Sequence, residues 1–190
     1  MIKDGHNHRV VSYKKGSVIY EPGQQPRYVY FIKSGEVRMV TVNGEGKEFI
    51  QGIFKAKQYF GEPALLLERP YLAYTIAVKD AELILVDKKG FLELLEVDRE
   101  FSTQLIHTLS NRLFYKSMML EELANEQAEH RIRTLINYLC RDLDKGAVLK
   151  VTRQAIADMS GLRVETAIRV IKKLADTGEI KLLRGKIVKS

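Results

Sequence analysis

The sequence predicts an α+β protein with antiparallel strands in its first half, then one long helix, and then short helices followed by a hairpin. Three patterns support this prediction. Turn residues separate β-rich runs over residues 9–88, no glycine occurs over residues 98–145, and residues 152–174 show the pattern of two short helices around a glycine turn. The 190-residue chain is 45% hydrophobic, which is enough for folded cores rather than disorder.

The first half is expected to form a barrel or a sandwich. Its β-rich runs are residues 18–20, 28–32, 37–42, 75–78 and 82–86. The residues that separate or flank them include Gly16, Pro22, Gly23, Gly35, Gly44, Gly46, Gly52 and Gly61. Many short strands with regular turns are typical of antiparallel barrels and sandwiches.

The segment after Asp98 predicts one long helix with two apolar surfaces. Phe101 and Leu105 widen one face, which suits packing on the strands. A second set repeats in alternating steps of three and four, as in a coiled coil, and comprises Ile106, Leu109, Leu113, Lys116, Leu120 and Leu123. We interpret this set as the seam of a homodimer, and its alternative is a core helix within one chain.

Residues 152–174 predict two helices around a tight turn. Thr152 is suited to cap the first helix, and Gly161 permits the left-handed backbone that ends it. In the second helix, apolar residues at i, i+3, i+4 and i+7 predict a buried stripe of Ala167, Val170, Ile171 and Leu174. The outward face then comprises Glu165, Ile168, Arg169 and Lys172. Such a helix is typical of proteins that enter a DNA major groove.

A strand, a turn and a strand follow over residues 178–188, with Arg184 and Gly185 in the turn. This pattern predicts a hairpin wing, so the C-terminal part is expected to be a winged helix-turn-helix.

The positive charge lies at one end of the chain. Residues 1–128 contain 17 basic and 17 acidic residues, whereas residues 129–190 contain 14 and 7, so the last segment carries the whole net charge of +7. A neutral body with a basic end predicts double-stranded DNA as a partner. One reading helix covers too few base pairs for specificity, which favours the homodimer.

The location is expected to be cytoplasmic, with no membrane partner. The chain has one cysteine, Cys140, no run of 18 apolar residues and no export signal in its first residues.

The order of strands, long helix and winged helix resembles the Crp/Fnr superfamily of bacterial transcription regulators. Residues 15–20, 22–23, 30–37 and 60–66 are similar to its glycine-punctuated cyclic-nucleotide-binding pattern, and residues 152–154 and 164–169 to its DNA-reading signature. The resemblance implies a β-roll or jelly-roll sensor domain over 1–97, a dimerisation helix with a hinge over 98–125, and a DNA-binding domain over 126–190. It also implies RNA polymerase as a partner. The polar stretch 125–127, after which a helical apolar pattern resumes at Ile132, predicts a hinge near 124–129.

Side-chain chemistry suggests roles on the outward face. Arg169 has the fork that binds guanine O6 and N7, while Glu165 can accept from a cytosine amino group or brace Arg169. Ile168 suits a thymine methyl group. Arg163 stands where a helix start disfavours positive charge, so we expect either a DNA phosphate or base edge beside it, or solvent if the helix begins elsewhere. For Glu165 and Arg169 the alternative is an exposed ion pair.

Contacts to DNA phosphates are expected from polar and basic residues around this face. They are Thr152, Arg153, Gln154, Thr166, Lys172, Lys173, Lys181, Arg184 and Lys186.

The predicted sensor domain retains part of the nucleotide-binding pattern. The resemblance implies that Gly61 opens a phosphate cassette, that Glu62 holds a ribose hydroxyl, and that an arginine about ten residues later neutralises the phosphate. Tyr71 stands in that place, and a buried phosphate without a countercharge is costly. We therefore do not expect cyclic AMP to bind, although Arg69 or Lys116 offers a substitute charge. The candidate effector residues for an unidentified small molecule, or for no ligand, are Gly61, Glu62, Tyr71, Tyr74, Lys116 and Ser117.

Other sensing chemistries are not expected. One cysteine is too few for an iron–sulfur cluster, His107 and His130 lie on expected helices rather than in a haem site, and Cys140 falls on an apolar stripe as an inert thiol. We predict no cofactor and no enzyme activity, because a cupin-type enzyme needs metal-binding histidines and residues 9–98 contain none. The rival function is a ligand-binding regulatory module that acts through protein contacts, whose DNA binding would be weak and insensitive to salt.

Overall fold

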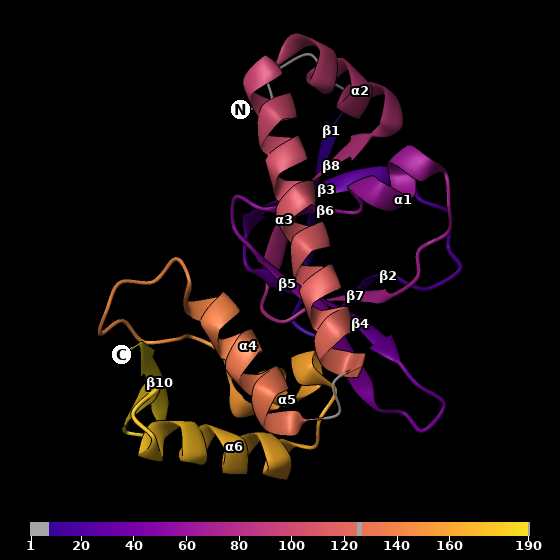
Figure 1. The fold of residues 1–190 in the computed structure, drawn as a ribbon. Coiled ribbons are helices and arrows are strands. Elements are labelled where there is room, and N and C mark those ends of the chain that lie inside the picture. Colours follow the sequence, from indigo (N-terminus) through magenta and orange to yellow (C-terminus); the bar gives the residue numbers. More distant parts are fainter. Residues whose placement is uncertain (1–7, 125–126, 190) are drawn as a thin grey trace. The chain divides into compact units, whose positions relative to one another are not determined.

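The computed structural model describes residues 8–124 and 127–189 (Figure 1). The chain divides into two compact units, Met1–His107 and Thr108–Ser190. The division falls within the long helix α3 (Arg99–Ala124). The predicted hinge near 124–129 includes residues 125–126, which lie outside the described residues.

Two four-stranded antiparallel sheets form most of the first unit, as expected for a β-roll. One sheet has the order β1 (His8–Tyr13), β8 (Ala81–Asp87), β3 (Tyr28–Ser34) and β6 (Tyr59–Phe60). The other has the order β2 (Val18–Tyr20), β7 (Tyr74–Ala77), β4 (Glu36–Val42) and β5 (Glu48–Lys55). The five predicted strands are confirmed, and β1, β5 and β6 are additional.

Gly52 does not separate two strands, so this prediction is wrong. Gly52 lies inside β5 opposite Met39, while the next pair joins Ile50 to Val40, so the β5 strand has one extra residue at this point. This offset is a β-bulge, a feature that glycine often marks within a strand.

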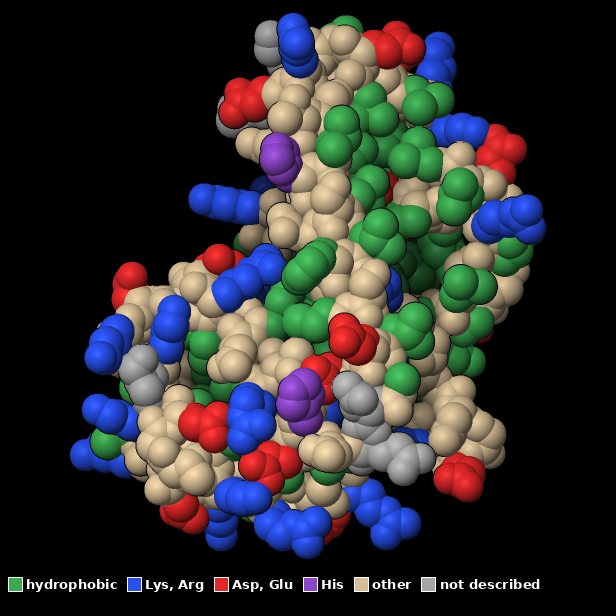
Figure 2. Space-filling model, in the orientation of Figure 1, with side chains coloured by type: hydrophobic (Ala, Val, Ile, Leu, Met, Phe, Trp, Pro, Cys, Tyr) green, Lys and Arg blue, Asp and Glu red, His purple; other side chains and the backbone are tan. Residues whose placement is uncertain are grey.

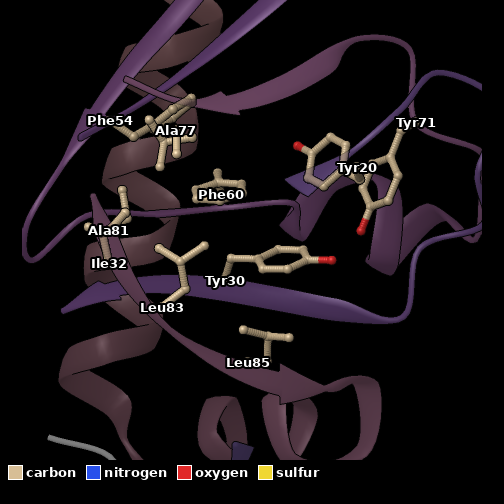
Figure 3. Close-up of a cluster of buried hydrophobic side chains, with 11 residues drawn as sticks. Tyr20, Tyr30, Ile32, Phe54, Phe60, Tyr71, Ala77, Ala81, Leu83 and Leu85 are labelled. Carbon is tan, nitrogen blue, oxygen red and sulfur yellow. The ribbon is translucent and has the colours of Figure 1, made fainter. Parts of the chain in front are cut away.

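Alternate strand residues build a shared apolar core (Figure 3). In β8, Ala81, Leu83 and Leu85 are buried while Glu82 and Ile84 between them are half-buried, as the two-residue period of a strand requires. Rings from other strands complete this cluster, which positions the residues of the expected effector site.

The first unit also contains two helices and the start of α3. α1 (Glu62–Leu67) follows β6, and α2 (Lys88–Val97) begins at Asp87, whose carboxylate accepts from the Gly90 N–H at 2.8 Å. At the start of α3, the Phe101 ring lies 5.9 Å from Phe31 and 5.7 Å from Tyr59, centroid to centroid. These contacts confirm that the first turns of α3 pack on the strands.

The second unit contains the rest of α3, α4 (Ala128–Cys140), α5 (Arg153–Ser160) and α6 (Val164–Asp176), followed by the antiparallel hairpin of β9 (Ile180–Leu183) and β10 (Lys186–Lys189). Its core comprises Ile132, Leu135, Ile136, Ile156, Ile171, Leu174 and Ile187, all less than 2% exposed. The predicted winged helix-turn-helix is confirmed. Within the described residues, no helix is both long and apolar enough to cross a bilayer.

Gly35 provides a direct test of the packing between β3, β4 and β8. Its φ is +92°, and an added Cβ would lie 2.4 Å from the Asp80 carbonyl oxygen and 2.6 Å from the Ala81 Cα. We expect Gly35→Ala to lower the free energy of unfolding by more than about 4 kcal/mol, measured by urea denaturation followed by circular dichroism.

Gly23→Ala is the matched control, because Gly23 has a similar φ of +84° with nothing within 4 Å of an added Cβ. It should cost only the left-handed penalty of about 1–2 kcal/mol. Equal losses in the two variants would show that the close approach at Gly35 is unimportant.

Candidate nucleic-acid interface and effector barrel

The turn between α5 and α6 is set by local capping. The Thr152 side-chain oxygen accepts a hydrogen bond from the Ala155 N–H at 3.0 Å, and Gly161 ends α5 with a φ of +68°. Both predictions are confirmed. The Thr152 hydroxyl is exposed and retains its own hydrogen for donation to a phosphate.

α6 has two distinct faces. Ala167 and Ile171 are fully buried, and Val170 and Leu174 lie beside them, as predicted. The opposite side exposes Glu165, Ile168, Arg169 and Lys172, which we call the reading face. Since none of these four residues is buried in the protein core, they form a surface suited to contact with a partner.

Arg163 lies at the position where α6 begins. It is the N-cap residue and its side chain makes no capping hydrogen bond. The guanidinium is exposed beside the helix N-terminus, where backbone N–H groups and the helix dipole favour an anion. The expected neighbour of Arg163 is therefore negatively charged.

Three of the residues predicted to contact phosphate are bonded within the domain. The Arg153 Nη2 donates to the Gly185 carbonyl at 2.9 Å, Gln154 Nε2 donates to Asp158 at 2.8 Å, and Lys173 Nζ donates to Glu129 at 2.5 Å. Burial lowers the pKa of Arg153. These bonds give Arg153, Gln154 and Lys173 a supporting role in the free protein, which the sequence analysis did not anticipate.

The wing presents a basic tip. Arg184 and Gly185 both have positive φ, +48° and +76°, which is the signature of a type I′ hairpin turn. The side chains of Arg184, Lys181 and Lys186 are exposed. Lys and Arg side chains gather along the lower margin of the molecule, over α6 and the wing (Figure 2).

The predicted seam of α3 is exposed in the single chain. Ile106, Leu113 and Leu120 are each 65–69% exposed, and Leu123 is 41% exposed. Lys116 is exposed and Leu109 is half-buried. The sequence analysis missed Phe114, which is 69% exposed next to Leu113 and broadens the apolar strip. Such a strip usually marks an interaction surface.

The interior of the β-roll contains stacked aromatic rings (Figure 3). Tyr71 stacks on Tyr20 with centroids 3.6 Å apart, and Tyr30 stacks on Phe60 at 5.0 Å. All four residues are buried, and burial raises the pKa of both Tyr30 and Tyr71. The position where the family resemblance implies a phosphate-binding arginine is therefore packed into an aromatic core.

The remaining effector candidates have different surroundings. Gly61 is the N-cap of α1 with a φ of +91°, and an added Cβ would lie 3.1 Å from the Tyr28 carbonyl oxygen. Glu62 is fully buried in the first turn of α1, and Tyr74 is half-buried in β7. Arg69 is exposed. Lys116 and Ser117 are exposed on the part of α3 that belongs to the second unit.

Cys140 is a buried free thiol. Burial raises the pKa of the Cys140 thiol, which makes it a poor nucleophile. Among residues 8–124 and 127–189, no group of three or more His, Cys, Asp or Glu is arranged to hold a metal ion.

A buried charged cluster escaped the sequence analysis altogether. Glu122, at the end of α3, is 5% exposed and is bonded to His130 and Thr134 of α4. Arg131 of α4 is 8% exposed and is bonded to Glu122 and Ser160. The only signal in the sequence was a set of charged residues within helical apolar patterns, which does not reveal contacts between distant positions.

Two models of known protein families match this chain, one in each half. The family model of the cyclic nucleotide-binding domain matches residues 10–98, and that of the Crp-like helix-turn-helix domain matches residues 130–189.

Relatives and solved structures agree with these matches. The chain is 27% identical over 175 residues to the cyclic AMP receptor protein of Thermus thermophilus, covering 92% of this chain and 81% of the relative. It is 27% identical over 184 residues to the global nitrogen regulator of a Nostoc species, covering 92% and 80%. A Crp/Fnr-family transcriptional regulator of Thermus thermophilus superposes with a TM-score of 0.68 at 27% identity, covering 96% and 93%.

The buried phenols predict a loss of stability at alkaline pH. Because the folded pKa of Tyr30 and Tyr71 is raised above 10.0, their contribution to stability is complete below pH 10 and falls as the pH rises above it. Tyr71→Phe removes one of these groups. We expect its urea midpoint to fall less than that of the wild type between about pH 9 and about pH 11. Equal falls would show that Tyr71 ionises as readily in the folded protein as in the unfolded chain.

Proposed function

Because the chain belongs to the Crp/Fnr superfamily of transcription regulators, we propose that it acts as a homodimer that binds a near-palindromic DNA operator through its recognition helices, residues 163–175. The observation that carries this proposal is the two-faced α6, whose apolar side is buried and whose reading face is exposed.

Base readout is assigned to the reading face. Arg169 offers two parallel donors to guanine, and Glu165 lies one turn earlier on the same side of α6. Ile168 is 37% exposed and presents an apolar group suited to a thymine methyl. Arg163 supports binding from the start of the helix.

Phosphate contacts are assigned to exposed groups around that face, which position α6 without reading sequence. The exposed groups are Thr152, Lys172, Arg184 and Lys186, to which we add the half-buried Thr166, with Arg153, Gln154 and Lys173 at the edge of the surface. The excess of basic over acidic residues in 129–190 supplies the long-range attraction to DNA.

The exposed apolar strip of α3 supports the dimer. A symmetric pair would cover Leu113 and Leu120 and would carry two copies of α6. Two recognition helices one helical turn apart on the same side of a duplex read two half-sites. The protein would act in the cytoplasm, next to RNA polymerase.

The sensor domain is proposed to respond to a small molecule other than cyclic AMP, or to none. A phosphate in the place of Tyr71 would need a countercharge and would displace the stacking of Tyr71 on Tyr20. Any ligand would act by shifting the population of dimers whose recognition helices fit successive grooves.

Selection of bound duplexes from a random pool tests the proposed function, with affinity then measured at several salt concentrations. We expect an inverted repeat and a steep loss of affinity as salt rises. Weak binding that does not depend on salt would instead indicate a module that acts through protein contacts.

Arg169→Ala tests base readout. On the selected operator it should lose about 1–3 kcal/mol of binding free energy and relax the preference for one G·C pair, because the bidentate donor is gone. Fluorescence anisotropy with the operator and single-base variants measures both effects.

Lys172→Ala is the matched control from the next turn of α6. It should weaken binding to all sequences equally and reduce the salt slope by about 1. If Arg169→Ala behaves in the same way, Arg169 contacts phosphate rather than a base.

Removal of small molecules from the protein tests whether the expected effector site needs a ligand. The protein is unfolded in denaturant, dialysed and refolded, and its operator affinity is compared with that of the untreated sample. We expect unchanged affinity if the tyrosine-packed barrel needs no ligand. A loss that a cell extract restores would point to a bound effector that the purification retains.

A further inference from the structure

The second compact unit contains the reading face and all of the predicted dimer seam except Ile106. The part of α3 from Thr108 to Ala124 belongs to this unit and carries Leu109, Leu113, Leu120 and Leu123. α6 lies in the same unit. The geometry that joins seam to reading face is therefore set by contacts within one compact body, and the bonds around Glu122 are prominent among them.

Glu122 is an unusual residue for a buried position. It is 5% exposed, whereas its neighbour Glu121 is exposed. One carboxylate oxygen lies 2.6 Å from His130 Nδ1, and the other accepts a hydrogen bond from the Thr134 hydroxyl at 2.9 Å. Burial of a carboxylate is costly unless both oxygens find partners, so this arrangement holds α4 in one position against the last turn of α3.

Arg131 extends this arrangement to the helix-turn-helix. Its Nε donates to the Glu122 carbonyl at 3.2 Å, and its Nη1 donates to the Ser160 carbonyl at 3.1 Å. Ser160 is the last residue of α5, where backbone carbonyls lack partners within the helix. One planar guanidinium thus connects the end of α3 to the turn that leads into α6.

An aromatic contact joins α3 to α4 at a second place, which prevents α4 from rotating about the contact at Glu122. The Tyr115 ring stacks on Tyr138 with centroids 4.3 Å apart, and burial raises the pKa of Tyr115. Tyr115 precedes Glu122 by about two helical turns, or roughly 10 Å along the axis. Two contacts this far apart fix both the position and the direction of α4.

Ion pairs carry the connection from α4 to α6. Glu129 accepts from Lys173 of α6, and Arg133 pairs with Glu179 just before β9 at 2.6 Å. The hydrogen bond from Lys173 lowers the pKa of Glu129. Bonded side chains therefore connect α4 to the end of α3 through Glu122 and to α6 through Glu129, with the backbone of α4 between the two sets.

We propose that Glu122, Arg131, His130 and Thr134 form a charged joint that positions each reading helix relative to the dimer seam. The joint sets the half-site spacing that the dimer accepts, with Glu122 and Arg131 as positioning residues that do not touch DNA. This inference rests on the proposed function, since a spacing preference requires a DNA-bound dimer.

The test measures spacing discrimination in the full-length chain. The probes are the selected operator, the same operator with two base pairs inserted or removed at its centre, and a duplex with one half-site. The variants are Arg131→Lys, which keeps the charge but lacks the two separate donor nitrogens that reach the Glu122 and Ser160 carbonyls, and Glu122→Gln, which keeps the shape but loses the charge. Glu121→Gln is the matched control on the exposed side of α3.

We expect the wild type and Glu121→Gln to bind the operator about 100-fold more tightly than the altered spacings. In Arg131→Lys and Glu122→Gln this ratio should fall to about tenfold or less, while the half-site affinity stays within about twofold of the wild type. Circular dichroism checks that each variant is folded, and either folded variant suffices for the test.

Two results would overturn the inference. Unchanged discrimination in a folded variant would show that the joint does not position the reading helices. Equal losses on the operator, the altered spacings and the half-site would show that the joint only stabilises the fold. A wild type without any spacing preference would instead contradict the proposed function itself.

Discussion

The period of α6 is the constraint on which the DNA interface depends. An α-helix has 3.6 residues per turn, so residues on its opposite sides are set by their spacing. The reading face is therefore exposed because the other side of α6 is buried through Ala167, Val170, Ile171 and Leu174. The buried stripe packs α6 on α4 and α5. The outward residues lie outside this stripe, so the side chains proposed to read bases are not the ones that pack α6 into its domain.

In the β-roll, unlike α6, the same interior residues serve both the fold and the expected ligand site. The residues that would line an effector site also build the core, because Tyr71 stacks on Tyr20 and Glu62 is fully buried in α1. A phosphate at this place would have to replace aromatic contacts and find a countercharge elsewhere, such as Arg69 or Lys116. Residues 10–98 therefore match the cyclic nucleotide-binding domain while a stacked tyrosine, Tyr71, stands where the resemblance implies an arginine.

Local patterns in the sequence predicted the recognition module well. The Thr152 cap, the Gly161 turn, the buried stripe of α6 and the wing turn each depend on residues a few positions apart. Features that depend on distant residues were missed. Nothing near Gly52 distinguishes a bulge from a turn, and the bond from Arg153 to Gly185 joins positions 32 residues apart. The charged joint links 122 to 131 and 131 to 160, so its detection required the folded chain.

Guanine methylation protection on the selected operator tests most directly whether paired α6 helices occupy successive major grooves. The reagent attacks guanine N7, the atom that Arg169 is proposed to approach. We expect two protected patches related by two-fold symmetry and separated by about one helical turn, roughly 10 base pairs. Protection of a single patch, or of no guanine in an operator that the protein binds tightly, would contradict the dimeric recognition on which the proposed function rests.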